Sequence, residues 1–354
     1  MSNPLRVLVI DDSALMRKLI PQILAKDPSI EVVGTAMDGE FGLKKIEELR
    51  PQVVTLDLEM PRMDGMETLR QIMRRYKLPV IVVSAHSTSG ASATFKALAL
   101  GAFDFVAKPR DAASAHMDDI AMELIGKIKV AASSQPRVAP AASEHPRIVK
   151  PRKSAGNNQK PTKIIALGIS TGGPIALEHL LTQLPYDFPG AFAIVQHMPE
   201  GFTEMFARRL DDCCAIEVKE AQSGDMLVAG RALICPGNKH LRVKRMALGD
   251  VVLLADDAPV NGHRPSVDVL FRSVAKEFGS GALGVLMTGM GEDGAEGLGV
   301  MKQAGALTIA QDEYSSVVYG MPKAAVEKNA AREILPLSEI AAAISSKIFT
   351  SQKK

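Results

Sequence analysis

LRVLVIDDS, residues 5–13, decides the fold of the first third of the chain. It is a short aliphatic run closed by Asp11 and Asp12, the pattern of a buried strand in a parallel α/β sheet. Three more apolar runs are closed by a polar side chain, namely Asp57 in VVTLDLEMP, Ser84 in PVIVVSAHS and Lys108 in FDFVAKP.

The side chains that close these runs are predicted to meet in space. The carboxyl ends of parallel strands share one edge of a sheet, so three carboxylates, a hydroxyl and a lysine converge there. Three carboxylates repel one another unless a hard cation lies among them, and Mg²⁺ takes oxygen ligands of this kind. The pattern predicts a site that moves a phosphoryl group onto a carboxylate. The rest of the chain is then expected to be controlled by that phosphorylation.

Amphipathic stretches alternate with the apolar runs up to about Lys129. The runs predicted as strands are Leu5–Ile10, Ile30–Thr35, Val53–Leu56, Val80–Val83 and Phe103–Val106. Five strands alternating with five helices indicate a doubly wound, five-stranded parallel sheet. Ser13 is expected to cap the first helix, and Pro21 to kink it or break one of its hydrogen bonds.

Composition limits the class of protein. A chain of 354 residues suits two domains, and 46% hydrophobic residues without tryptophan fit a soluble α/β protein. The net charge of +2 is too small to indicate a nucleic-acid groove. No apolar run approaches the ~20 residues that cross a bilayer, and the N-terminus does not resemble a signal peptide. Three cysteines without metal spacing are expected to be reduced thiols. A cytoplasmic protein without direct membrane insertion is expected.

A change of composition separates two domains. Residues 131–162 are rich in Ala, Ser, Pro, Lys and Arg and contain almost no large apolar residue, so they cannot bury a core. The predicted division is a first α/β domain at 1–129, a flexible basic linker at 130–162 and a second α/β domain at 163–350. The basic residues of the linker either confer solubility or contact an acidic neighbour.

The second domain returns to the α/β rhythm. Its predicted strands are Ile164–Ile169, Ala191–Gln196, Ala282–Thr288 and Ala306–Ala310. Its predicted helices are Ile175–Leu184, Thr203–Leu210, Ser266–Glu277 and Ala295–Gln303. Within Leu241–Ala255, Gly249-Asp250 between two apolar runs indicates a hairpin. A mainly parallel sheet with an antiparallel excursion is therefore expected.

A glycine-rich turn follows the first strand of this domain. KIIALGISTGGP presents Ser170 in a Gly-x-Ser-x-Gly pattern, which projects a hydroxyl beside backbone N–H groups. The serine is either a nucleophile, or the turn only starts a helix or holds a phosphate.

His197 and Asp293 are the predicted partners of that serine. His197 closes the strand AFAIVQHMP, and Asp293 follows ALGVLMTG in the turn GMGEDG, so all three residues are expected at one sheet edge. An imidazole takes the hydroxyl proton and a carboxylate orients the imidazole. Asp293 could also cap the next helix. Weaker rivals are Asp256, Asp268, His240 and His263.

Several motifs, in one order along nearly the whole chain, resemble the chemotaxis protein-glutamate methylesterase family, CheB. They are VLVIDDSALMR, TLDLEMPRMDGMETL, GISTGGP, QHMP, HRPSVDVLF, MTGMGEDGAEGL and LTIAQDEYSSVVYGMPKAA. The resemblance implies a response-regulator receiver domain, a linker and a C-terminal α/β methylesterase domain.

The resemblance also implies a role for individual residues. In the receiver, Asp57 resembles the phosphoacceptor. The oxygens of the Mg²⁺ pocket are expected from Asp11, Asp12, Asp57 and the backbone of Glu59. The residues that resemble the receiver switch are Ser84, Phe105 and Lys108. In the second domain, Ser170, His197 and Asp293 resemble the catalytic triad, with the oxyanion held by backbone near Met290 and with Thr171 beside the nucleophile.

The implied function is a phosphorylation-activated hydrolase of a two-component system. It would cleave glutamate γ-methyl esters on chemoreceptors, release methanol and deamidate receptor glutamines. Mg²⁺ would serve receiver phosphorylation, and ester hydrolysis would need no cofactor. The implied partners are methyl-accepting chemoreceptors as substrate and the histidine kinase CheA as phosphodonor, with no nucleic acid. The unphosphorylated receiver is expected to cover the active-site edge.

Two other classes of function fit parts of the sequence. A non-catalytic adaptor would use the turn at Ser170 to bind a phosphate or peptide, but it leaves the three strand-end residues as a coincidence. A transcription factor is poorly supported, because the C-terminal part is too large and insufficiently basic for a simple helix-turn-helix output.

Overall fold

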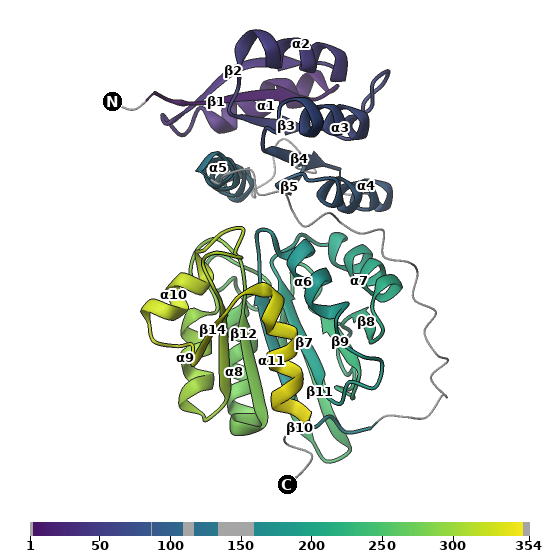
Figure 1. Cartoon of the computed structure of the whole chain (residues 1–354), viewed down its shortest axis with the longest axis vertical. Helices are drawn as coiled ribbons and strands as arrows, with labels where there is room; N and C mark the ends of the chain where they lie inside the picture. Colours follow the sequence, from purple (N-terminus) through teal and green to yellow (C-terminus); the bar gives the residue numbers. More distant parts are fainter. Residues whose placement is uncertain (1–2, 86, 109–116, 134–158, 350–354) are drawn as a thin grey trace. The chain divides into compact units, whose positions relative to one another are not determined.

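The protein folds as two compact units, Met1–Ser143 and Glu144–Lys354, each described here by itself. The computed structural model describes residues 3–85, 87–108, 117–133 and 159–349 (Figure 1). Most of the predicted linker at 130–162 lies outside these described residues.

The first unit is built on a five-stranded parallel sheet. Its strands, in the spatial order β2-β1-β3-β4-β5, have the bounds β1 Leu5–Ile10, β2 Ile30–Ala36, β3 Val53–Leu56, β4 Val80–Ser84 and β5 Asp104–Ala107. The chain starts at β1, places β2 on one side of it and β3 on the other, so the order reverses at β1. Crevices at the carboxyl ends of strands beside such a reversal are the usual ligand sites of open α/β sheets.

Helices cover both faces of this sheet (Figure 1). They are α1 Ala14–Leu24, α2 Gly39–Leu49, α3 Gly65–Arg75, α4 Thr88–Ala99 and α5 Met117–Ser133. Helix α1 packs against α5 on one face, while α2, α3 and α4 pack in sequence on the other. The buried core between the sheet and the α1–α5 layer is aliphatic and includes Val7, Val9, Ile20, Ile81 and Leu124.

The second unit contains a seven-stranded sheet in which every strand pair is parallel. In the order β14-β13-β12-β6-β7-β9-β8 its strands are β6 Ile164–Ile169, β7 Ala191–Gln196, β8 Glu217–Glu220, β9 Arg231–Ile234, β12 Ala282–Leu286, β13 Leu307–Gln311 and β14 Glu333–Leu335. The direction of strand order changes at β6, which is flanked by β7 and by the much later β12.

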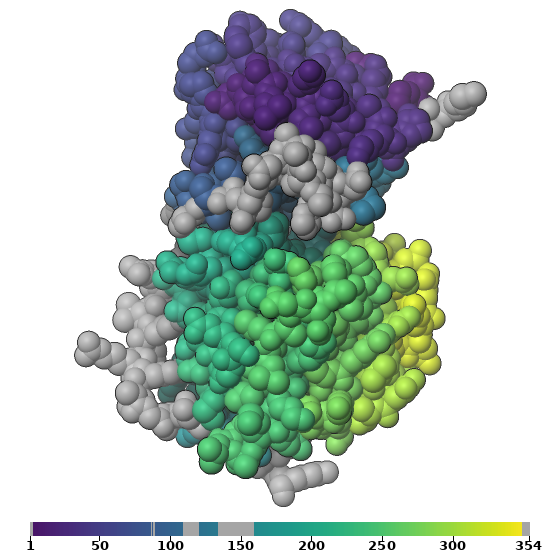
Figure 2. Space-filling model, turned by 180° about the vertical axis from the view of Figure 1, so that it is seen from behind, coloured from purple at the N-terminus to yellow at the C-terminus, as the bar shows by residue number. Residues whose placement is uncertain are grey.

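Two helical layers enclose this sheet. The helices are α6 Gly173–Leu181, α7 Phe202–Cys213, α8 Val267–Phe278, α9 Ala295–Gln303, α10 Met321–Glu327 and α11 Leu337–Phe349, with a 3-10 turn η1 at Gly279–Gly281. α11, α6 and α7 form one layer, while α8, α9 and α10 form the other. The α8–α9 layer belongs to the green surface that Figure 2 shows from behind. An antiparallel hairpin of β10 (His240–Met246) and β11 (Gly249–Ala255) packs against α8.

The predicted fold class is confirmed, with small corrections. The bounds of four predicted strands are reproduced at Leu5–Ile10, Val53–Leu56, Ile164–Ile169 and Ala191–Gln196. The predicted strand Ala282–Thr288 ends earlier, at Leu286, because the Thr288 N–H and hydroxyl bond to side chain and loop atoms instead of a strand partner. The hairpin exists, but its turn lies at Ala247-Leu248, since Met246 pairs with Gly249.

The first helix shows both features that the sequence predicted for it. The Ser13 hydroxyl accepts a hydrogen bond from the N–H of Met16 at 3.4 Å, which caps α1. Pro21 lies inside α1, and the helix continues through it to Leu24. Because proline has no N–H, the helical bond that this residue would donate is missing.

Candidate active site and acidic pocket

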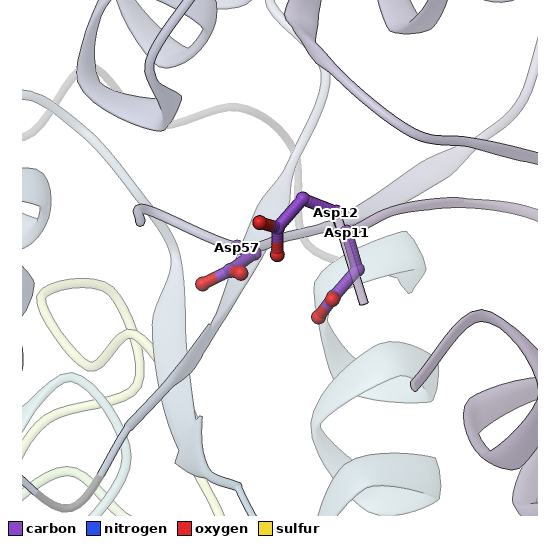
Figure 3. A group of neighbouring side chains, drawn as sticks. All are labelled: Asp11, Asp12 and Asp57. Carbon is purple, nitrogen blue, oxygen red and sulfur yellow. The ribbon is translucent and has the colours of Figure 1, made fainter. Parts of the chain in front are cut away.

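Three carboxylates gather at the carboxyl edge of the first sheet. Asp11 and Asp12 follow β1, Asp57 follows β3, and one oxygen from each lies within 4.8 Å of the others (Figure 3). Lys108, which follows β5, places its Nζ 2.7 Å from Asp57 Oδ2 and 3.1 Å from Asp11 Oδ2. The structure therefore brings together four of the five polar residues that sequence reasoning placed at this edge; the fifth is Ser84.

The electrostatics of this pocket suit a hard cation. Burial raises the pKa of Asp57 to about 6, although the ammonium of Lys108 opposes the rise. Burial likewise raises the pKa of Asp11, whose buried Oδ2 has the Lys108 ion pair but no hydrogen bond. A divalent ion with oxygen preference would relieve this crowding of negative charge, so the donor set fits Mg²⁺. The N–H of Glu59 donates to Asp57 Oδ1 at 3.2 Å and helps to fix that carboxylate.

The predicted switch residues lie beside this pocket on β4 and β5. The buried Ser84 hydroxyl donates to the carbonyl of Gly90 at 3.2 Å and lies 2.7 Å from the hydroxyl of Thr94, so helix α4 holds it. The buried Phe105 ring meets Phe95 edge-on, with centroids 6.3 Å apart. Ser84 is therefore engaged away from Asp57 in this structure.

Ser170 and His197 follow two neighbouring strands in register. Ile169 of β6 pairs with Gln196 of β7, so the next residue of each strand is the serine and the histidine. The side chain of Gln196 joins them, because its Nε2 donates to the carbonyl oxygens of Ser170 at 3.0 Å and of His197 at 3.1 Å. The two residues are thus fixed at the same edge of the sheet by backbone as well as by a buried amide.

Glycines make the serine turn possible. Gly172 has φ +75°, which L side chains rarely adopt, and a Cβ there would lie 2.5 Å from Val317 Cβ. A Cβ on Gly289 would lie 2.8 Å from Ser170 Cβ. The Ser170 side chain therefore packs directly against the backbone that leads into Met290.

His197 is hydrogen-bonded to Asp293, which the loop after β12 carries across the end of β6. The Nε2 of His197 lies 2.9 Å from Asp293 Oδ2. A carboxylate only accepts, so Nε2 carries the hydrogen and Nδ1 carries the lone pair. That Nδ1 is buried and has no hydrogen-bond partner in the described structure. The imidazole is therefore arranged as a base at Nδ1.

Asp293 is held at the start of α8. Its carboxylate accepts from the N–H groups of Val267 at 2.7 Å and Asp268 at 3.3 Å and from the Ser266 hydroxyl at 2.8 Å. Burial alone would raise the pKa of Asp293, but the bond to His197 and these donors hold it well below its ordinary value. The group stays an anion, as required to stabilise an imidazolium.

The rivals named from sequence have other roles. Asp268 Oδ1 accepts from the N–H of Gly297 at 2.6 Å and so caps α9, while exposed Asp256 pairs with Lys239. The alternative that Asp293 caps the next helix, α9, is wrong, because Asp293 instead caps α8. His240 is fully buried and bonds to the N–H of Ser266 and to a carbonyl, so it is structural.

The remaining triad contact is open. Within the described residues no hydrogen bond joins the Ser170 hydroxyl to His197. Catalytic contacts are often loose in the absence of substrate, so proximity on adjacent strand ends is the relevant observation. Thr171 is buried next to Ser170, and in the described part of the chain neither its N–H nor that of Met290 is engaged in a hydrogen bond. Both remain available as donors.

Sequence reasoning underrated one segment, the turn at Val260–His263. Asn261 donates to Asp293 Oδ1 at 3.0 Å, and the His263 ring stacks on His197 with centroids 4.0 Å apart. The signal was present, because Asn-Gly is the strongest short hairpin-turn dipeptide and His263 follows it directly.

Comparison with known proteins agrees with both units. Residues 165–344 match the family model for CheB methylesterase, and residues 7–117 match that for the response regulator receiver domain. A protein-glutamate methylesterase/protein-glutamine glutaminase 2 of Koribacter versatilis is 62% identical over 344 residues, 96% of this chain and 95% of that protein. The chain belongs to the CheB methylesterase family.

Further CheB relatives cover the same extent. A protein-glutamate methylesterase/protein-glutamine glutaminase of Symbiobacterium thermophilum is 49% identical over 352 residues, 97% of this chain and 96% of that protein. The crystal structure of the Thermotoga maritima CheB methylesterase catalytic domain aligns with a TM-score of 0.51 and 37% identity, over 52% of this chain and 98% of that one. The predicted family is therefore confirmed. In the part of the chain that the structure describes, every helix is too short or too polar to cross a bilayer.

Proposed function

We propose that Ser170, His197 and Asp293 form the hydrolytic site of a receiver-regulated protein-glutamate methylesterase that is also a protein-glutamine glutaminase. Membership of the CheB family supplies the activity and its place in chemotaxis. The single observation that supports the site is the 2.9 Å bond between His197 Nε2 and the buried Asp293, at the sheet edge where Ser170 follows β6.

The chemistry follows from the tautomer of His197. The Ser170 oxygen attacks the γ-carbonyl of a methylated glutamate while Nδ1 of His197 takes the hydroxyl proton. Asp293 stabilises the imidazolium, which then protonates the departing methanol. Water hydrolyses the acyl-enzyme by the same route in reverse. A glutamine side chain differs only in its leaving group, so ammonia leaves instead and glutamate is again the product.

Backbone donors beside the serine are the proposed oxyanion site. The N–H groups of Thr171 and Met290 flank Ser170, one directly after it and one behind Gly289, against which the serine packs. A single donor of this kind typically contributes about 3–4 kcal/mol to the stabilisation of the transition state.

The receiver pocket is the proposed phosphorylation site. Asp57 accepts the phosphoryl group, and Lys108 contacts that carboxylate at 2.7 Å. Mg²⁺, held by Asp11, Asp12, Asp57 and the Glu59 backbone, would neutralise phosphate charge during transfer. Ser84 and Phe105 then rearrange as the switch. A histidine kinase, CheA, is the proposed phosphodonor, methyl-accepting chemoreceptors are the proposed substrates, and the proposed location is the cytoplasm, without nucleic acid as a partner.

The test is methanol release from methylated receptor membranes by the full chain, with and without acetyl phosphate and Mg²⁺. Ser170→Ala is expected to abolish release in both conditions, because no nucleophile remains. Asp57→Asn is expected to keep the basal rate and lose the stimulation. Ser346→Ala, on α11, is the matched serine control and is expected to behave as the unaltered protein.

A non-catalytic adaptor predicts a different outcome. A serine-directed fluorophosphonate would then leave Ser170 unlabelled, and the unaltered chain would release no more methanol than Ser170→Ala. Either result removes the hydrolytic assignment.

A further inference from the structure

A tight turn outside the predicted triad faces the site. Val260 and His263 exchange both backbone hydrogen bonds, with N–H to carbonyl distances of 3.0 Å and 2.9 Å. Between them, Asn261 and Gly262 both have positive φ, at +54° and +75°. This is the two-residue hairpin turn for which Asn-Gly is favoured. The turn is therefore a locally determined, rigid element and not a loose loop.

The turn presents two side chains to the two partners of the nucleophile. Asn261 Nδ2 lies 3.0 Å from Asp293 Oδ1 and 2.9 Å from Asp268 Oδ2, so it ties the triad carboxylate to the cap of α9. The His263 ring lies on the His197 ring, with an interplanar angle of 12° and centroids 4.0 Å apart. Asp293 and His197 are thus each contacted by one residue of the same turn.

The contact made by His263 is through its ring face. Within the described residues neither of its ring nitrogens has a hydrogen bond, and its backbone N–H is used in the turn. Burial, and next the adjacent His197, lower the pKa of His263 to about 4, so the ring is neutral near neutral pH. A neutral flat ring can lie against an imidazole that becomes positively charged during catalysis, whereas a charged ring would repel it.

We propose that His263 is a positioning residue of the esterase: its ring fixes the plane of His197, so that Nε2 stays on Asp293 and Nδ1 stays available to Ser170. This inference rests on the proposed function of that site. His197 has one hydrogen bond through its ring, which leaves rotation about that bond unopposed except by packing. The stacked ring supplies that packing, and what it requires is a flat apolar face and not a nitrogen atom.

The experiment compares His263→Ala with His263→Phe in the full, acetyl-phosphate-activated chain. His263→Ala removes the stacked face and is expected to lower kcat for methanol release by about ten- to a hundred-fold, the size of effect that a misplaced catalytic group produces. Its KM is expected to stay within about two-fold, since the ring orients the base and not the substrate. His263→Phe restores a flat ring and is expected to keep kcat within about three-fold of the unaltered protein.

Two controls distinguish a loss of His197 positioning from a general effect of a histidine substitution or from misfolding. His179→Ala, a histidine substitution on α6, is expected to change neither kcat nor KM. The proton on His197 Nε2 gives a low-field NMR resonance while it is held by Asp293; this resonance is expected to persist in His263→Phe and to broaden in His263→Ala at unchanged circular dichroism.

Three results would overturn the positioning role. They are full activity of His263→Ala, equal losses in His263→Ala and His263→Phe, and a change confined to KM. Ser170→Ala is assayed in parallel: if it stays active, the proposed function fails, whereas an inactive Ser170→Ala beside a fully active His263→Ala rejects only the inference.

Discussion

At the scale of single residues, the second unit devotes an unusual number of donors to one carboxylate. Asp293 receives the His197 ring, two N–H groups of α8, a serine hydroxyl and an asparagine amide. A buried anion is costly unless its oxygens are fully hydrogen-bonded, and this set satisfies both of them. The arrangement fixes the charge state of Asp293 and the tautomer of His197 together.

Asp293→Asn is expected to lower kcat by roughly 10⁴-fold without unfolding the domain. The Ser266 hydroxyl, the Asp268 N–H and the Asn261 amide all donate to Oδ1, so the new amide is expected to keep its oxygen there. Its NH₂ would then face His197, and the Val267 N–H would lose its acceptor. The ring would then accept at Nε2 and carry its hydrogen on Nδ1, which removes the base. Single-turnover labelling by a fluorophosphonate measures this loss. Labelling at the ordinary rate would contradict the tautomer assignment.

The stacked His263 also predicts a pH dependence of stability. Its pKa of about 4 in the folded protein lies below the ordinary value of 6.5. Between these values the unfolded chain binds a proton that the folded protein does not, so the free energy of unfolding falls as pH falls. The expected loss is about 1.4 kcal/mol per pH unit, or roughly 3 kcal/mol from pH 6.5 to 4.

Urea unfolding of the 163–350 fragment between pH 4 and pH 7 measures this effect. The carboxylates titrate in the same range, so the quantity of interest is the difference between the unaltered fragment and His263→Phe. That difference is expected to grow toward low pH. Parallel curves for the two proteins would show that His263 is protonated normally in the fold.

At the scale of elements, β6, its turn and β7 are coupled by one side chain. Gln196 is 2% exposed and donates to the carbonyls of both Ser170 and His197. Its Oε1 is buried without a partner and lies close to Gly173, where an added Cβ would be 2.0 Å away. The start of α6 therefore has room for this amide only because Gly173 has no side chain.

Gln196→Met is expected to destabilise the second unit by about 1–3 kcal/mol. Within the described residues it removes the donor of the His197 carbonyl and one of the two donors of the Ser170 carbonyl, which keeps the Gly173 N–H. Chemical denaturation of the 163–350 fragment gives the value. Gln183→Met is the control, since the exposed side-chain amide of Gln183, just after α6, donates to the His179 carbonyl and has no other hydrogen bond within the described residues. Equal effects of the two substitutions would show that the Gln196 hydrogen bonds contribute no more to the free energy of unfolding than the exposed Gln183 bond.

At the scale of the whole molecule, two parallel sheets each present chemistry at their carboxyl edge, and regulation must pass between them. The family resemblance predicts that the unphosphorylated receiver masks the esterase edge. The 163–350 fragment is then expected to release methanol faster than the unphosphorylated full chain. Each ~1.4 kcal/mol by which phosphorylation favours the open state would raise the open-to-closed ratio ten-fold. A fragment no faster than the unphosphorylated whole would rule out masking.

How much the sequence could predict depended on the range of the interaction. Strand-end residues such as Asp57, Ser170 and His197 were found from local apolar runs, because parallel strands bring their ends together by geometry alone. The helix α8 was predicted, but its capping by Asp293 was missed, since α8 precedes that aspartate in sequence and reaches it only through tertiary packing. The His263 stack was missed for the same reason. The Asn-Gly dipeptide predicts the local conformation of the turn but not which residues the turn packs against.

The resting arrangement of Ser84 has a consequence for signal fidelity. Its hydroxyl is already satisfied by Gly90 and Thr94 of α4, so leaving them carries a free-energy threshold. Under the proposed switch role, a phosphoryl group offers oxygens that compensate for those lost bonds, whereas a proton arriving on Asp57 offers none. Acidification would thus neutralise Asp57 without causing Ser84 to rearrange. The receiver would respond to phosphorylation by its kinase and not to a fall in pH.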